Sequence, residues 1–105
     1  MNSGAVFRAL ADPTRREILQ ELKAGERTAG DIVQRFPISG PSISRHLSIL
    51  KGAGLVAERR EGNRIFYRLE PEQLAHIVGD FLSAVCPTQI VGRRKARRKS
   101  NKEPP

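Results

Sequence analysis

The chain is short, strongly basic and almost free of cysteine: it has 105 residues, a formal net charge of +8 and a single cysteine, Cys86. A single cysteine cannot form an internal disulfide or a thiolate metal cage. The sequence also contains no run of about 18 apolar residues, the length needed to span a membrane. The N-terminal segment also lacks the layout of a secretory signal. We therefore expect a single cytoplasmic domain without stable membrane insertion, which a partner subunit would help to stabilise because so short a chain buries little of its surface.

The positive charge is concentrated near the C-terminus. Residues 93–105 hold seven Lys or Arg and one acid, whereas residues 1–92 hold twelve bases and ten acids. Net charge therefore describes the tail more than the rest of the chain. We predict a folded domain at residues 1–91 and a basic, disordered tail at residues 92–105. The tail either adds salt-sensitive attraction to DNA or only keeps the protein soluble.

Two helices are predicted at the start of the chain. The first carries Val6, Phe7 and Leu10. The second runs from Pro13 to about Ala24, with Asp12 as its cap. Its apolar stripe is formed by Ile18, Leu19 and Leu22.

A helix-turn-helix is predicted next. Thr28 and Asp31 have the spacing of a capping box, and they open a helix of about two turns that ends before Pro37. Ser39 then caps another helix, which reaches to about Ala53. Two helices joined by so short a turn must cross steeply, and this arrangement inserts one helix into the DNA major groove.

A β-hairpin and a last helix complete the pattern. Strands are predicted from Leu55 and from Arg64 to Leu69, and residues 59–63 form the hairpin tip. Pro71 starts the last helix, which ends before Pro87 and has a wide apolar stripe. The predicted fold is mainly α (α+β): a winged helix-turn-helix with about five helices and a two-stranded wing, in the order ααααββα. No internal repeat is visible.

The apolar stripe of the last helix has no partner helix in the chain. It motivates a homodimer in which this helix, with the first helix, meets its own copy across a two-fold axis. The residues assigned to this dimer interface are Val6, Leu10, Leu74, Val78, Phe81 and Val85.

Four sequence runs in order, ALADPTRREIL, TAGDIV, SISRHLSILKGAGLV and EGNRIFYRL, resemble the ArsR-type winged-helix repressors, and within them the SdpR-like autorepressor group. The resemblance covers about residues 5–85. It implies a homodimeric repressor that occludes a palindromic operator in double-stranded DNA. It also suggests, as an alternative form of control, sequestration by a protein or membrane partner.

Metal-sensing members of that family carry a Cys-x-Cys type motif before the recognition helix, or Asp, His and Glu ligands along the dimer helix. Here TAGDIVQRF has no cysteine, and His76 and Asp80 are followed by FLSAVCPT without further ligands at that spacing. We therefore predict no metal site and no cofactor.

The recognition helix supplies the first candidate DNA contacts. Ile43, Leu47 and Leu50 mark its buried side, and polar residues occupy the other side. An arginine there can bind a guanine in bidentate fashion, whereas serines discriminate less between bases. The candidates are Ser42, Ser44, Arg45 and Ser48. A plain solvated face is the alternative.

The hairpin supplies a second set of candidates: Arg60, Asn63 and Arg64, which are placed to reach phosphates or the minor groove. Alternatively, these charges only protect the hairpin from edge-to-edge aggregation. Of Arg15 and Arg16, one is expected near the DNA backbone and the other in a structural role. His46 is expected to pack or to form hydrogen bonds.

Other functions fit the sequence less well. No nucleophile is arranged with a histidine, and no phosphate loop or cofactor fingerprint is present, so an enzyme is not expected. RNA-binding proteins usually stack bases on exposed aromatic rings. The five aromatic residues of this chain are mostly assigned to the core, so RNA binding fits the sequence less well than DNA binding.

Overall fold

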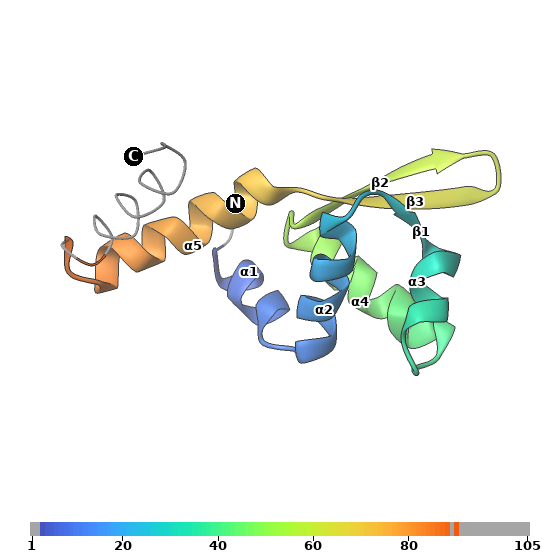
Figure 1. Ribbon diagram of the computed structural model, residues 1–105, viewed down its shortest axis with the longest axis horizontal. Helices are drawn as coiled ribbons and strands as arrows, with labels where there is room; N and C mark the ends of the chain where they lie inside the picture. Colours follow the sequence, from blue (N-terminus) through green and yellow to red (C-terminus); the bar gives the residue numbers. More distant parts are fainter. Residues whose placement is uncertain (1–2, 89, 91–105) are drawn as a thin grey trace, which may run out of the picture. The chain divides into compact units, whose positions relative to one another are not determined.

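A computed structural model describes residues 3–88 and residue 90 of the chain, and Figure 1 shows the arrangement of its helices and strands. In chain order the elements are α1 (Ser3–Leu10), α2 (Pro13–Lys23), β1 (Arg27–Thr28), α3 (Ala29–Arg35), α4 (Gly40–Gly52), β2 (Val56–Glu61), β3 (Arg64–Leu69) and α5 (Pro71–Val85). The predicted winged helix-turn-helix is confirmed. The two-residue strand β1 is an addition that the sequence did not predict.

The chain divides into two compact units, with the boundary between Leu74 and Ala75, inside α5. The first unit contains α1 to α4 and the sheet, and the second begins within α5. Residues 91–105 lie outside the described part of the chain. The predicted basic tail and the predicted end of the domain at residue 91 therefore lie outside it too.

The core of the first unit is formed by apolar side chains from all four of its complete helices and from the start of β2. The predicted stripes of α2 and α4 are confirmed, since Ile43, Leu47 and Leu50 of α4 are fully buried and the stripe of α2 is almost so. Burial of one such side chain stabilises the fold by about 1.5–3 kcal/mol. The buried apolar residues are Val6, Ala9, Ile18, Leu19, Leu22, Ile32, Ile43, Leu47, Leu50, Ala53, Leu55 and Val56.

The three predicted helix caps are present. Asp12 Oδ2 accepts from the Arg15 amide at 3.1 Å. Thr28 and Asp31 form the reciprocal capping box at the start of α3. Ser39 Oγ accepts from the Ser42 amide at 3.3 Å at the start of α4. Each cap satisfies an amide that has no partner within its helix.

Helices α3 and α4 pack against each other and are joined by residues 36–39. The side chain of Ile32 on α3 is fully buried. Pro37 lies in the connection, where a further helical turn would lack one of its hydrogen bonds. The short connection fixes α4 as the second helix of a helix-turn-helix.

The sheet has the order β1-β3-β2, and both pairings are antiparallel. Strand β2 is longer than predicted: Arg59 and Arg60 were assigned to the hairpin tip but lie in the strand, opposite Phe66 and Ile65. The tip is only Gly62 and Asn63. Gly62 has φ of +63°, which glycine adopts at the first central position of a two-residue type II′ turn.

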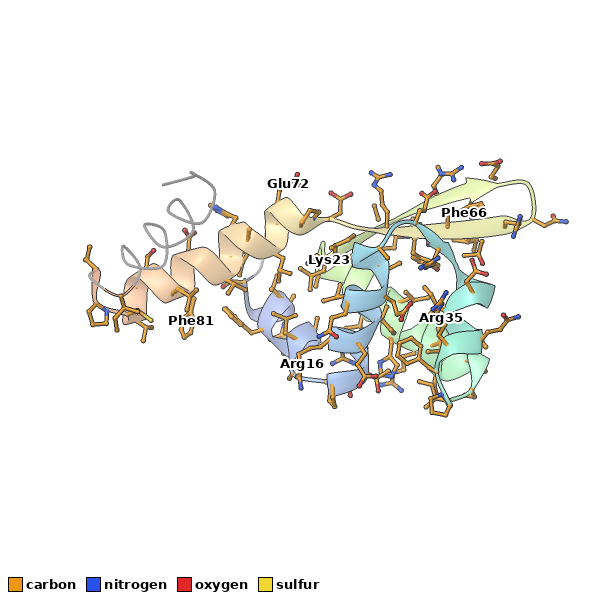
Figure 2. All side chains as sticks on the ribbon, in the orientation of Figure 1. Arg16, Lys23, Arg35, Phe66, Glu72 and Phe81 are labelled. Atoms are coloured by element: carbon orange, nitrogen blue, oxygen red, sulfur yellow. The ribbon has the colours of Figure 1, made fainter. Side chains whose placement is uncertain are left out.

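Helix α5 contains no buried residue in the described structure. The side chains of Phe81, Leu82 and Val85 are exposed, Phe81 by 51% and Val85 by 64%, and Figure 2 shows Phe81 projecting from the helix. Large apolar side chains exposed together on one helix are a feature of interaction surfaces. No helix within the described residues is long and apolar enough to cross a membrane.

Candidate DNA-binding surface

Helix α4 presents a polar face opposite its buried side. Ser42, Ser44, Arg45 and Ser48 are all exposed, as their positions in the sequence predict. Because Ile43, Leu47 and Leu50 are buried in the core, apolar packing determines which face of α4 remains exposed. The four candidate residues thus share one accessible side of the helix.

Ser42 differs from the other serines on this face because its hydroxyl group already has a partner. The Ser39 hydroxyl donates to Ser42 Oγ at 3.1 Å, and Ser39 Oγ caps the Ser42 amide. The Ser42 hydroxyl still retains its own proton to donate. It lies in the first turn of α4, where amide groups point out of the helix end.

In the wing, Arg59 is held by two carboxylates and an aromatic ring. Its Nε and Nη2 donate to the two carboxylate oxygens of Glu26 at 3.3 and 2.7 Å, and its Nη1 donates to Glu61. The guanidinium carbon lies 4.4 Å from the centroid of the Phe66 ring, in a cation–π contact. The hydrogen bonds from Arg59 lower the pKa of Glu26, and those to Glu26 and Glu61 raise the pKa of Arg59.

Other bases near the candidate surface are also neutralised. Lys51 Nζ lies 2.9 Å from Glu58 Oε1, and Arg68 Nε lies 3.2 Å from Glu70 Oε1. The hydrogen bond from Lys51 lowers the pKa of Glu58. Farther along the helix-turn-helix, Arg35 pairs with Glu21 at 3.2 Å.

Three arginines predicted to contact DNA differ from these bases. Within residues 3–88, Arg45, Arg60 and Arg64 have no ion pair with a carboxylate. Arg64 instead lies over the Phe66 ring, with its guanidinium carbon 5.6 Å from the ring centroid. All three arginines are exposed. The structure therefore separates neutralised bases from bases whose charge is available to an anionic partner.

Asn63 and Arg64 border an open groove between the wing tip and the start of α3. Its volume is about 450 Å³, and Asp31 and Gln34 lie on the opposite wall. The hydrogen bond from the Thr28 amide is the main cause of a lowered pKa of Asp31, and Arg64 adds a smaller contribution. The groove is thus lined by an exposed cation from the wing and by a carboxylate of α3 that is engaged in capping.

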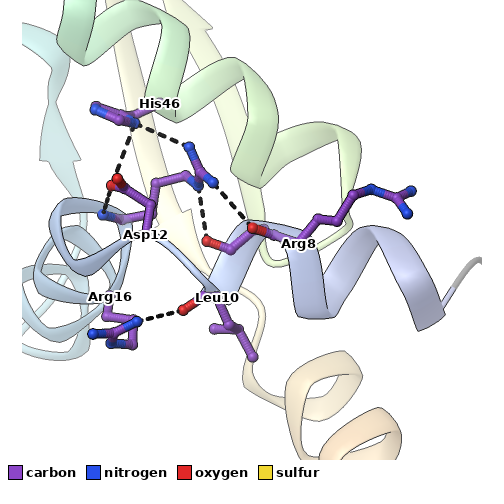
Figure 3. Close-up of polar contacts among 7 residues, drawn as sticks. Arg8, Leu10, Asp12, Arg16 and His46 are labelled. Carbon is purple, nitrogen blue, oxygen red and sulfur yellow. Dashed lines mark hydrogen bonds and ion pairs between the residues drawn. The ribbon is translucent and has the colours of Figure 1, made fainter.

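Arg15 and Arg16 both contact the C-terminal end of α1, at the corner between α1 and α2 (Figure 3). Arg15 Nε donates to the carbonyl of Ala9 at 2.8 Å and Arg15 Nη2 to that of Arg8 at 3.0 Å, while Arg16 Nη1 donates to the carbonyl of Leu10 at 2.7 Å. Both arginines therefore have structural contacts, and the expectation that one of them lies near the DNA backbone stays a prediction.

His46 takes part in the same corner. Its Nδ1 lies 3.3 Å from Arg15 Nη1 and 3.8 Å from Asp12 Oδ2, and its side chain is 19% exposed. The prediction that His46 forms hydrogen bonds is confirmed.

The residues predicted at a dimer interface differ in accessibility. Phe81 and Val85 are exposed, and Leu10, Leu74 and Val78 are half-buried. Val6 is 0% exposed in the core of its own chain, so its side chain has no surface for a partner subunit. The assignment of Val6 was wrong because its apolar spacing reflects packing within the chain.

The described residues contain no group of three or more His, Cys, Asp or Glu side chains that could hold a metal ion. His76 Nε2 lies 3.5 Å from Asp80 Oδ2, one helical turn away, and both side chains are largely exposed. Cys86 is half-buried and has a free thiol.

Two contacts near the site were missing from the sequence predictions. Glu26 and Arg59 are 33 residues apart, and Arg15 and His46 are 31 residues apart. No local pattern marks pairs so distant in sequence. For Glu26 and Arg59 the sequence shows only that bases and acids are present, and it does not show which base meets which acid.

Comparisons with known proteins agree with this geometry. A helix-turn-helix domain family matches residues 10–59. The transcriptional repressor SdpR of Bacillus subtilis is 48% identical over 80 residues, which cover 76% of this chain and 89% of the repressor.

Solved structures give the same result. An ArsR-like transcriptional regulator from Rhodococcus sp. RHA1 has a TM-score of 0.71 and 34% identity, with 96% of this chain and 92% of that chain covered. The homodimeric winged helix-turn-helix DNA-binding domain of a possible ArsR-family regulator from Mycobacterium bovis has a TM-score of 0.65 and 33% identity. In that comparison, 77% of this chain and 76% of the other are covered.

Proposed function

Since the chain belongs to the ArsR family of winged helix-turn-helix transcriptional repressors, we propose that it represses transcription as a homodimer bound to a palindromic operator. The family consists of DNA-binding regulators, so an enzymatic function is excluded. Its place of action would be the cytoplasm, where bacterial operators lie.

The observation that carries this proposal is the position of Arg45. It lies on the exposed face of α4, next to exposed serines, and within the described residues it has no ion pair. Four other bases of the helix-turn-helix and wing, namely Arg35, Lys51, Arg59 and Arg68, are paired with acids. An exposed, unpaired guanidinium on the second helix of a helix-turn-helix is suited to bidentate contact with a guanine.

The remaining contacts follow from the same placement. Ser44 and Ser48 flank Arg45 and would reach base edges or nearby phosphates, and Ser42 would reach the backbone from the first turn of α4. In the wing, Arg60, Asn63 and Arg64 would contact the flanking backbone or the minor groove. Arg59 is not part of this set, because two carboxylates already occupy its donors.

The proposed dimer rests on α5. Its apolar side chains are exposed in the single chain, and a structural neighbour with 33% identity is described as homodimeric. Two copies related by a two-fold axis would present two α4 helices to successive major grooves. The half-sites would then lie about 10 base pairs apart, and their sequences would be related by the same symmetry.

Selection from a pool of random DNA duplexes tests the proposal. The full-length protein should enrich an imperfect palindrome whose half-sites are one helical turn apart, and titration of that duplex should give two chains per duplex. Enrichment of no sequence would overturn the assignment of a specific operator. Enrichment of a single asymmetric site, bound by one chain, would overturn the dimer.

A further inference from the structure

The C-terminal end of α1 is capped by side chains from the next helix. The last four carbonyl groups of an α-helix have no partner within the helix. Here Arg15 binds the carbonyls of Arg8 and Ala9, and Arg16 binds that of Leu10 (Figure 3). Cations at this end also interact favourably with the helix dipole.

The third guanidinium nitrogen of Arg15, Nη1, reaches α4. This nitrogen lies 3.3 Å from Nδ1 of His46. A guanidinium group can only donate hydrogen bonds, so Nδ1 must accept and the ring proton must lie on Nε2. Asp12 Oδ2 lies 3.8 Å from Nδ1 of His46, beyond hydrogen-bond distance, and accepts from the Arg15 amide at 3.1 Å. A hydrogen bond at this position therefore requires the tautomer of His46 that carries its proton on Nε2.

This contact acts on the helix that carries the proposed base-reading residue. His46 directly follows Arg45 in α4 and lies at the edge of the buried stripe. The apolar contacts of Ile43, Leu47 and Leu50 depend little on direction, so packing alone permits small rotations of α4. A hydrogen bond is directional and limits such rotations. A rotation of 10° would move an atom about 6 Å from the helix axis by about 1 Å.

We propose that Arg15 is a positioning residue for DNA recognition, which fixes the rotation of α4 through His46 and thereby places Arg45 for bidentate contact with a base. This inference rests on the proposed function, because it assigns Arg45 to the operator. Arg15 itself does not touch DNA in this proposal. Its effect on affinity passes through His46 and is confined to the specific operator.

The first test needs no DNA. Two-bond ¹H–¹⁵N correlation spectra of the full-length protein at neutral pH should show His46 with a bare Nδ1 and a protonated Nε2. In Arg15→Met the ring should become a mixture of tautomers, whereas Arg16→Met, which removes a cap on the same helix end, should leave it unchanged. A protonated Nδ1 in the wild type, or the same spectrum in Arg15→Met, would overturn the proposed contact.

The second test is a double-mutant cycle in operator affinity, with Arg15→Met, His46→Leu and the double variant. Arg15→Met should weaken operator binding about tenfold, or about 1.4 kcal/mol. In the His46→Leu background the same change should have less than about a twofold effect, because the partner is already gone. Binding to random duplexes should stay within about twofold throughout.

Two further variants separate positioning from general stability. His46→Asn places an amide oxygen where Nδ1 was, so affinity should stay close to wild type and Arg15→Met should still weaken it about tenfold. Arg16→Met should leave operator affinity within about twofold. Effects of Arg15→Met and His46→Leu that multiply independently, or an equal loss in Arg16→Met, would show a structural role only and would overturn the proposal.

These two tests also separate this proposal from the proposed function. Absence of operator preference in the wild type would contradict the proposed function while the tautomer test still stands. Normal operator preference with independent effects of Arg15 and His46 would contradict only the positioning role.

Discussion

Arg59 Nη2 donates a hydrogen bond to Glu26 Oε1 across 2.7 Å, so strand β2 is linked to the segment between α2 and β1. The adjacent Arg60 has no ion pair within the described residues. Two arginines next to each other in sequence therefore have different surroundings: one has acidic partners in its own chain, and the other is available to an external anion.

This difference predicts that two matched substitutions have unequal effects on DNA affinity. Arg60→Gln should weaken binding to operator and random duplexes alike by about three- to tenfold, because it removes one phosphate contact, and should reduce the salt dependence by about one counterion. Arg59→Gln should change affinity by less than about twofold. Fluorescence anisotropy across a salt series measures both. A larger loss in Arg59→Gln than in Arg60→Gln would contradict this division.

Arg45 should determine operator preference. Arg45→Ala should reduce affinity for the selected operator by about 1–3 kcal/mol, the range for one bidentate base contact. Random duplexes should lose much less, since only one charge is removed. Arg45→Lys is the control: it keeps the charge but not the forked donors, and should lose most of the discrimination. Equal losses on operator and random DNA in Arg45→Ala would limit Arg45 to a phosphate contact.

The exposed apolar side of α5 should hold the dimer together. Phe81→Asp should convert the protein largely to monomers in sedimentation analysis and reduce operator affinity by more than about tenfold, because the two half-sites would no longer be bound as a unit. Ser83→Asp is the matched control: it adds the same charge on the opposite side of the helix and should leave the dimer intact. A stable Phe81→Asp dimer would place the interface elsewhere.

Acid should destabilise the fold through three carboxyl groups. The pKa values of Glu26, Asp31 and Glu58 are lowered in the folded chain by hydrogen bonds from Arg59, Thr28 and Lys51, respectively. The unfolded chain therefore binds more protons in the acidic range, and stability rises with pH there. The contribution is complete above about pH 5–6 and is lost as pH falls through about 4 toward the folded values.

Urea unfolding at several pH values measures this dependence. Asp31→Asn should show a smaller loss of stability between about pH 6 and pH 3, because the amide still accepts from the Thr28 amide but does not titrate. The wild type should follow the steeper curve. Identical pH dependence in the two proteins would show that the lowered pKa of Asp31 does not contribute to stability.

Much of the fold is predictable because it depends on local rules. The caps at Asp12, Thr28 and Ser39 lie within three residues of the amides that they bind, and the buried stripes of α2 and α4 follow the helical period. These signals predict the helix-turn-helix and the exposed face on which Arg45 lies. They need no information about distant residues.

Pairing across the fold is not predictable in this way. Strand β1 is two residues long and exists only because Arg27 and Thr28 meet Tyr67 and Phe66 of β3. The length of β2 depends on its register with β3, which placed Arg59 and Arg60 in the strand. The sequence spacing placed Val6 on an apolar stripe available to a partner subunit. In the structure α1 packs on α2 and α4, and Val6 is fully buried.

From the sequence alone came the order of the elements, the helix caps, the family resemblance and the residues of the recognition helix, because each depends on spacing within a few helical turns. Only the tertiary structure decided which arginines of the helix-turn-helix and wing are neutralised by acids and which remain available. It also revealed that Arg15 joins the end of α1 to His46 on the recognition helix. Side chains about 30 residues apart come into contact only when the chain is folded, so the spacing of residues within a helix or strand does not predict such contacts.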